Sequence, residues 1–209
     1  MASFGPCPLL VDIAQPVAIM IHMWPPPYEI TEEFYLIGEP EAEYKSEYRQ
    51  GRVVAMSGAS PAHSLIQVNL ARVLGNALLG TPCHVFSSET RVKVATARFY
   101  TYPDLSATCA EPVFDRLDAV ALVNPSLIVE VLSPSSAVYD QGQKFEWYRQ
   151  LPSLLDYLLV WQDRVQLELR TRQPDGTWAA AVYTKRDETI VLMAVPAQLH
   201  VDDVYLKVL

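Results

Sequence analysis

Two carboxylates and one amine stand in parts of the sequence where such groups could do chemistry. Glu130 lies inside Leu127–Leu132, a run that is otherwise apolar, and a buried carboxylate is costly unless it is paired, protonated or bound to a cation. Asp104 follows Pro103 in a β-prone run, where a bend can redirect a side chain. Lys144 belongs to a later helical segment. Carboxylates of this kind offer the hard oxygen ligands that Mg²⁺ and Mn²⁺ prefer.

Each of these residues also has a purely structural explanation. Glu130 could form a buried salt bridge or end a strand at the surface, and a Pro-Asp pair such as Pro103-Asp104 often marks a turn. Lys144 stands three and four residues before Trp147 and Tyr148, so its stem could lie along an apolar stripe with the ammonium in water.

Helical periodicity predicts the elements around these residues. Apolar residues recur at helical spacing between His63 and Leu79, with Ser60-Pro61 as a start signal, and this pattern predicts a helix facing the core. Further helices are predicted over Ile30–Tyr48 and Gln141–Leu151.

Strand signals occupy much of the remaining chain. The continuously apolar run Leu127–Leu132 predicts a central strand covered on both faces. Asp175-Gly176 predicts a hairpin turn. The other predicted strands are Arg52–Met56, Cys83–Phe86, Thr90–Ala95, Phe99–Thr108, Tyr157–Trp161, Val165–Arg170 and Trp178–Tyr183.

Several separated motifs, in this order, resemble one family. They are Glu47 before Gly51, Ser60-Pro61-Ala62-His63, Tyr102-Pro103-Asp104, Ile128 to Ser135 around Glu130, Asp140 with Lys144 and Tyr148, and Leu158-Leu159-Val160. Together they resemble the Uma-two family of endonucleases, also called domain of unknown function 820, within the PD-(D/E)xK nucleases. The resemblance covers roughly residues 30–205. It implies an α/β fold, a restriction-endonuclease-like mixed β-sheet flanked by helices, with a C-terminal β-hairpin extension.

The sequence departs from the family pattern at two positions. Leu132 stands two residues after Glu130, where a lysine is expected, and the resemblance implies that Lys144 supplies the amine instead. Gln50 replaces an acidic residue often found before the glycine at position 51.

The resemblance implies a catalytic set of Asp104, Glu130 and Lys144. Asp104, Glu130 and the backbone carbonyl of Val131 would bind Mg²⁺ or Mn²⁺, which would activate a water for in-line attack on phosphorus. Glu47 is an accessory ligand candidate, with a solvated glutamate as the alternative. His63 could contact phosphate, or it could serve only in capping or packing at the start of its helix.

Length and composition bound the remaining expectations. A chain of 209 residues, half of them apolar, predicts one domain over 29–209 after a proline-rich irregular arm over 1–28. The interrupted apolar stretch Leu9–Met23 predicts neither export nor a membrane span. Cys7, Cys83 and Cys109 are odd in number and far apart, which favours a reduced, cytoplasmic setting.

A net charge of −8 argues against a protein that coats nucleic acid through bulk electrostatics, but a nuclease can be acidic. Three functions stay open: a metal-dependent endonuclease acting on nucleic acid, with DNA expected, a binding module that keeps the fold without activity, and a hydrolase of another phosphoester. A homodimer is expected from base rates, because two copies suit two-strand cleavage.

Overall fold

The structure is a computed structural model, and it describes residues 29–208. The predicted arm over 1–28 lies outside the described residues, so the predicted domain boundary stays a prediction. No helix within residues 29–208 is long and apolar enough to cross a membrane.

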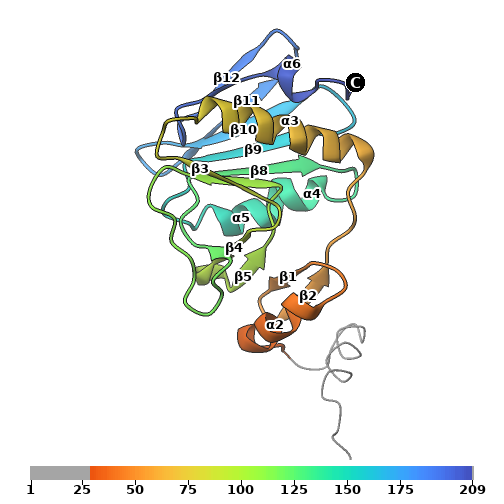
Figure 1. The fold of residues 1–209 in the computed structure, drawn as a ribbon, viewed down its shortest axis with the longest axis vertical. Coiled ribbons are helices and arrows are strands. Elements are labelled where there is room, and N and C mark those ends of the chain that lie inside the picture. Colours follow the sequence, from red (N-terminus) through yellow and green to blue (C-terminus); the bar gives the residue numbers. More distant parts are fainter. Residues whose placement is uncertain (1–28, 209) are drawn as a thin grey trace, which may run out of the picture.

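A six-stranded mixed sheet forms the centre of the fold (Figure 1). Its strand order is β11-β10-β9-β8-β6-β3, with β8 and β9 parallel and the other neighbours antiparallel. The strands are β3 (His84–Ser87), β6 (Leu105–Thr108), β8 (Leu127–Leu132), β9 (Asp156–Trp161), β10 (Leu167–Arg172) and β11 (Trp178–Tyr183). Every residue of β8 is buried, which confirms the central strand predicted from its apolar run.

A second, five-stranded sheet has the order β2-β1-β5-β4-β7. Its strands are β1 (Ser46–Arg49), β2 (Arg52–Ala55), β4 (Arg91–Val94), β5 (Phe99–Thr101) and β7 (Ala121–Leu122), and a 3₁₀ turn, η2 (Ala95–Ala97), joins β4 to β5. The predicted strand Phe99–Thr108 is therefore two strands in two different sheets. Pro103 lies between them, and proline cannot donate to a continuous ladder.

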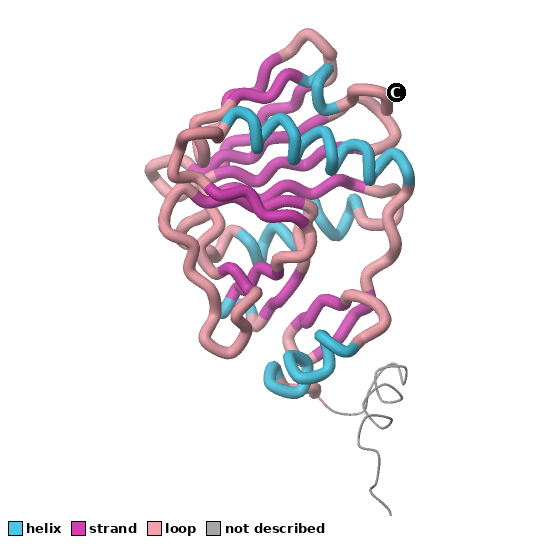
Figure 2. The backbone as a smooth tube through the Cα atoms, viewed as in Figure 1, coloured by secondary structure: helices cyan, strands magenta, loops and turns pink. Residues whose placement is uncertain are grey.

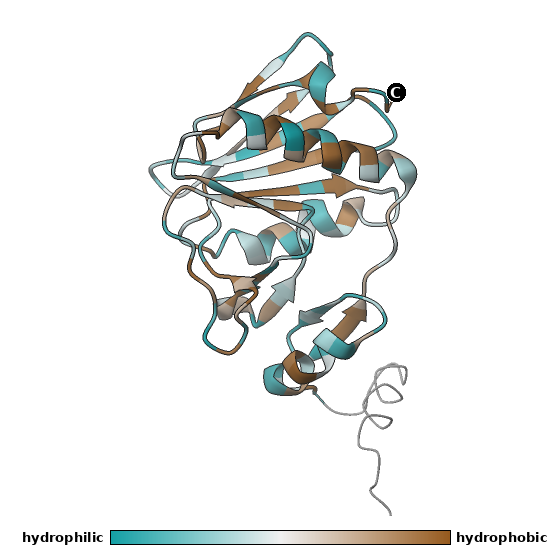
Figure 3. Cartoon of the chain, in the orientation of Figure 1, coloured by the Kyte–Doolittle hydropathy of each residue, from teal (hydrophilic) through white to brown (hydrophobic). Residues whose placement is uncertain are grey.

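The helix α3 (Pro61–Ala77) covers one face of the six-stranded sheet (Figures 1 and 2). It begins where predicted, because the Ser60 hydroxyl accepts the backbone N–H of His63 as an N-cap. Ile66, Leu70 and Leu74 are fully buried against the sheet. Figure 3 shows the corresponding pattern, with brown hydrophobic residues along the strands beneath this helix.

The opposite face is covered by three short helical segments in succession. They are α4 (Ala137–Tyr139), a π-helical turn η3 (Asp140–Lys144) and α5 (Phe145–Tyr148). The predicted helix Gln141–Leu151 thus begins earlier and ends earlier than expected. The π-turn is an uncommon element that is frequently found at functional sites, and it carries Lys144.

The first predicted helix, Ile30–Tyr48, is much shorter in the structure. It comprises α2 (Glu32–Gly38) and a 3₁₀ turn η1 (Glu39–Glu41), after which the chain enters β1. Pro40 lies at this transition and cannot continue an α-helical ladder. Ladder bonds to β2 and β5 then hold Ser46–Arg49 in an extended conformation.

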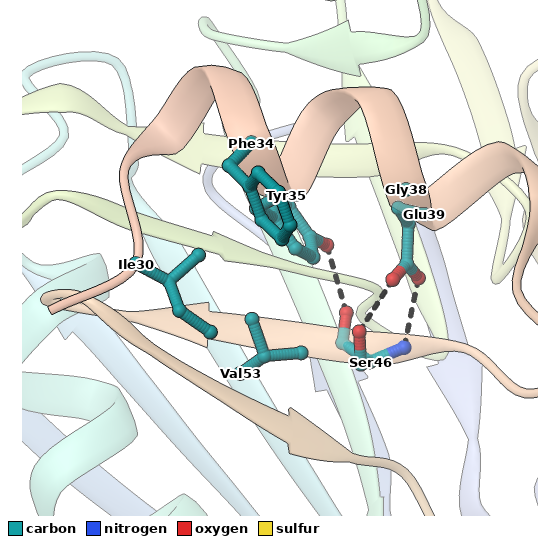
Figure 4. A pocket seen from close by; sticks show the side chains of 7 residues that line it. All are labelled: Ile30, Phe34, Tyr35, Gly38, Glu39, Ser46 and Val53. Atoms are coloured by element: carbon teal, nitrogen blue, oxygen red, sulfur yellow. Dashed lines mark hydrogen bonds between the residues drawn. The ribbon is translucent and has the colours of Figure 1, made fainter. Parts of the chain in front are cut away.

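A small hollow lies between α2 and the β1–β2 hairpin (Figure 4). Tyr35 donates to the carbonyl oxygen of Ser46 at 2.8 Å, and the Glu39 carboxylate accepts the Ser46 N–H at 2.8 Å. Tyr102 also donates to Glu39. Because its acid is satisfied by these bonds, the hollow is a packing feature rather than a candidate site.

The chain ends in a two-stranded hairpin, β12 (Thr189–Val191) and β13 (Gln198–His200), followed by α6 (Val201–Val204). This confirms the predicted C-terminal hairpin extension. Its apolar residues join the same core as α3.

Cys83 and Cys109 form a disulfide bond, contrary to the inference drawn from their wide spacing. Strand pairing explains the difference. His84 lies opposite Thr108 in the antiparallel β3–β6 register, so the next position brings Cys83 opposite Cys109. The cysteine pattern therefore gives no support to a reduced setting.

Candidate active site

Asp104 stands immediately before β6, at the point where the chain leaves the five-stranded sheet for the six-stranded one. Its Oδ2 accepts the backbone N–H of Val131 at 2.6 Å. Its Oδ1 accepts from Gln67 at 2.6 Å and lies 2.8 Å from Nε2 of His63. His63 and Gln67 are one turn apart in α3, so both side chains reach the same oxygen. The carboxylate is held firmly in one orientation.

The β6–β8 pairing brings Asp104 near Glu130 in space. Leu105 lies opposite Val129, and Asp104 stands one residue before this strand. The two predicted carboxylates, 26 positions apart in the sequence, are close enough for the charge of Asp104 to help raise the pKa of Glu130. Asp104 is held by α3 on one face of the sheet, whereas Glu130 is held by η3 and α5 on the other.

Glu130 projects toward the face covered by η3 and α5. Its Oε1 lies 2.8 Å from the ammonium of Lys144 and accepts the Tyr148 hydroxyl at 3.0 Å. Burial raises the pKa of Glu130 well above its ordinary value; Lys144 opposes this, while the charges of Asp140 and Asp104 add to it. The buried carboxylate is therefore paired, as its position in an apolar strand requires.

Lys144 lies among three carboxylates and is almost completely buried. Its ammonium is 2.8 Å from Glu130, 3.3 Å from Glu47 and 3.5 Å from Asp140. Burial alone would lower the pKa of Lys144, but these three acids outweigh it and raise that pKa well above the ordinary value. Lys144 thus stays protonated, and its ammonium is not extended into solvent.

Glu47 enters this cluster from β1 of the other sheet. Its carboxylate accepts from the hydroxyls of Thr101 and Tyr139 and from the guanidinium of Arg49. Burial would raise the pKa of Glu47, but Lys144 and Arg49 lower it overall. Glu47 is therefore held against Lys144, and its position as an accessory metal ligand stays a prediction.

The backbone of Val131 faces the Asp104 carboxylate, to which its N–H donates. Within a strand, the N–H and C=O of one residue point toward the same neighbouring strand, so the Val131 carbonyl points to the side where its N–H meets Asp104. Extending the register places Pro103 opposite Val131, and proline has no N–H to donate to that carbonyl.

The charges of the site do not balance. Asp104, Glu130, Asp140 and Glu47 supply four carboxylates, and the cations paired with them are Lys144 and Arg49. His63 adds a further positive charge only when it is protonated. Two routes can relieve this surplus of acid: protonation of Glu130 or Asp140, whose pKa values are raised by burial, or a bound divalent cation.

The ligand set available for such a cation is small. Within residues 29–208, no group of three or more His, Cys, Asp or Glu side chains has the arrangement of a metal site. Two carboxylates and one backbone carbonyl would have to suffice, with water and substrate completing the coordination. This composition fits Mg²⁺, which keeps several waters and is commonly bound through one or two carboxylates.

Several contributors to the site were not expected to act there. The pattern of α3 placed Gln67 off the apolar stripe, and its spacing of four residues from His63 was the available signal. Thr101 and Tyr139 gave no signal, because Thr101 reaches Glu47 through the β1–β5 register and Tyr139 reaches it through the packing of α4. Arg49 stands two residues after Glu47 in β1, so the two side chains share one face of that strand.

Comparison with solved structures shows that another protein shares this fold. A crystal structure from Anabaena variabilis, described as "a putative nuclease belonging to DUF820", superimposes with a TM-score of 0.70 and covers 88% of this chain and 100% of that one. The identity is 17%, so this similarity concerns the fold.

Sequence relationships then establish the family. The model of Uma2, described as "Putative restriction endonuclease", matches residues 31–204, and the chain belongs to this family. Two uncharacterized proteins of Synechocystis sp. are similar to it. The protein slr1290 is 37% identical over 177 residues (85% of this chain and 92% of that protein), and sll1609 is 38% identical over 149 residues (71% and 84%). Family and fold together support a nuclease.

Proposed function

We propose that the protein is a metal-dependent endonuclease that hydrolyses phosphodiester bonds in DNA. The observation that carries this proposal is the pair of neighbouring carboxylates, Asp104 and Glu130, in a cluster with more acids than cations. The family description and the nuclease-like fold support the same reaction class.

Asp104, Glu130 and the Val131 carbonyl would hold Mg²⁺ or Mn²⁺. When bound, the metal would acidify a water and stabilise negative charge on the scissile phosphate. His63 and Gln67 keep the Asp104 carboxylate in a fixed orientation, which limits the reorganisation needed for binding.

Lys144 supplies the permanent positive charge of the site. Because three acids raise its pKa, the ammonium stays charged at neutral pH and can stabilise the negative charge that develops on phosphate oxygens. Tyr148 and Lys144 together hold Oε1 of Glu130, so the second carboxylate is also positioned before any ligand arrives.

A supercoiled plasmid assay tests the proposal. The full chain should nick or linearise the plasmid with Mg²⁺ or Mn²⁺ and leave it intact in excess chelator. Asp104→Asn and Glu130→Gln should each lower the rate by at least about 100-fold, since even the partners of metal ligands commonly contribute 10–100-fold. Asp163→Asn is the control, because Asp163 is half exposed and pairs with Arg164 at the surface.

Equal cleavage by the wild-type chain and Asp104→Asn, or full cleavage in chelator, would contradict the proposal. Single-stranded RNA and simple phosphate esters, run in parallel, decide whether DNA is the preferred substrate.

The burial of the site favours one alternative, a nuclease fold that acts as a binding module. The Glu130 and Lys144 side chains are only 6% and 4% exposed, and Asp104 is 13% exposed. Calorimetry with Mn²⁺ separates the two functions. Heat of binding that disappears in Glu130→Gln supports the metal site, whereas a wild-type chain that binds no Mn²⁺ supports the binding module.

A further inference from the structure

The strand β11 forms one edge of the six-stranded sheet. It pairs with β10 from Trp178 through Tyr183, and among the strands of residues 29–208 none pairs with its other side. Its four middle residues, Ala179 through Val182, are exposed. An edge of this kind presents a row of backbone N–H and C=O groups to any other strand that approaches.

The sequence of β11 lacks the features that normally prevent strand pairing. Proteins protect free edges with charged side chains, proline, bulges or a covering segment. β11 reads Trp-Ala-Ala-Ala-Val-Tyr, without a charge or a proline, and its six residues follow the β10 register without a bulge. At the opposite edge, the ring of Phe114 lies against the ring of Phe86 in β3. An edge without protecting features can pair with a further strand.

We propose that β11 is the interface with a second copy of this chain, which pairs antiparallel about a two-fold axis at Ala180. In a symmetric antiparallel pair, one residue must lie opposite the same residue of the other copy at the two-fold axis. Two alanine side chains are small enough to meet there without a clash. The Trp178 side chain then lies opposite Val182 of the partner subunit. Two six-stranded sheets become one continuous sheet.

Charges at the two ends of the strand select this register. Asp175 is exposed five residues before Ala180, and Lys185 is exposed five residues after it. Antiparallel pairing at Ala180 therefore places Asp175 of one copy near Lys185 of the partner subunit. By symmetry, the same charge pair forms at both ends of the paired strands. Centring on Ala181 would instead place Lys185 opposite Thr177, and parallel pairing would bring like charges together. Opposite charges across strands stabilise a register, and like charges oppose it.

Sedimentation of the full chain tests the interface. The wild-type protein should be a dimer. Ala180→Lys, and separately Ala180→Glu, would place two like charges at the axis and should raise the dimer dissociation constant by about 100-fold. An equimolar mixture of the two variants should form a heterodimer again, because Lys then faces Glu. Val191→Lys on β12 is the control, since Val191 is as exposed as Val182, both at 54%.

Four results would overturn the proposal. They are a monomeric wild-type chain, a dimer that persists in Ala180→Lys, two monomeric variants that do not combine when mixed, and equal dissociation in Val191→Lys. A monomer whose β11 amides resist hydrogen exchange would show that another part of the chain covers the edge instead. The test reads mass alone, so its outcome is independent of whether the proposed nuclease activity is found.

Discussion

At the scale of single residues, the site is governed by the environment of Lys144. One buried ammonium lies within 3.5 Å of three carboxylates, and the burial of Glu130 and Asp140 raises the pKa of each. Removing one partner of a buried charge cluster leaves the others uncompensated, which costs more than the intact pair contributes. Lys144 therefore has both a structural and a proposed catalytic role.

Lys144→Met should lower the free energy of unfolding by about 3–5 kcal/mol, because Glu130 and Asp140 lose their buried cation. Urea denaturation at pH 7 measures this loss. Arg149→Met is the matched control. Arg149 pairs with Glu146 at the surface with 40% of its side chain exposed, so its loss should be at most about 1 kcal/mol. Equal losses in the two variants would show that the cluster is not electrostatically important.

The residues of the site differ in how far the sequence could predict them. Glu130 was identifiable because its apolar strand demands a partner, and that partner proved to be Lys144. The family resemblance named Asp104, and it left His63 either to contact phosphate or to serve in capping or packing at the start of its helix. In the structure His63 contacts Asp104, which neither local pattern nor spacing specifies. Contacts that cross between distant elements depend on register, and register was not predicted.

At the scale of elements, the sequence was most informative where periodicity was long. The helix α3 carries a sustained apolar stripe and a Ser-Pro start, and it was predicted closely. The segment Ile30–Tyr48 also carries a helical pattern, but Pro40 interrupts it. The last residues of the segment form strand β1, which pairs with β2. Tertiary hydrogen bonding outweighed local propensity there, as it did where Phe99–Thr108 divides between two sheets.

The turn between β11 and β12 should confer a pH-dependent part of the stability. The Glu188 carboxylate accepts the backbone N–H groups of Thr184 and Lys185, both at 2.8 Å, and these bonds lower the pKa of Glu188. A carboxylate with a depressed folded-state pKa stabilises the fold above its unfolded pKa of about 4.3, and this contribution is lost as the pH falls through the folded value.

Glu188→Gln should therefore have a lower Tm than the wild-type chain at pH 7, and the difference should shrink toward pH 3. Thermal melts across this range measure it, with Asp187→Asn as the control for removing a neighbouring exposed charge. A Tm difference that is constant with pH would contradict this account of the turn.

At the scale of the whole molecule, composition predicted one domain and an acidic balance but could not predict how the sheets are linked. The two sheets meet where β5 leads into β6, and Glu47 from one sheet contacts Lys144 beside the other. The Cys83–Cys109 disulfide was missed for the same reason, because it depends on the β3–β6 pairing.

The disulfide closes a loop with a sequence separation of 26 residues. Its removal in a Cys83→Ser/Cys109→Ser variant should lower the free energy of unfolding by about 3 kcal/mol, because the unfolded chain regains the entropy of the open loop. Denaturation with and without reductant measures the effect. Reductant should destabilise the wild-type chain and leave the double variant unchanged; a wild-type chain that is insensitive to reductant would contradict the prediction.

The central claim is that Asp104 and Glu130 share one divalent cation. Anomalous diffraction from crystals soaked in Mn²⁺ tests it most directly. We predict one strong peak between the two carboxylates, about 2–2.3 Å from an oxygen of each and from the Val131 carbonyl oxygen, and no peak there in Asp104→Asn. The account would be contradicted if wild-type protein cleaves DNA in solution but its crystals, after soaking in Mn²⁺, show no manganese between these residues.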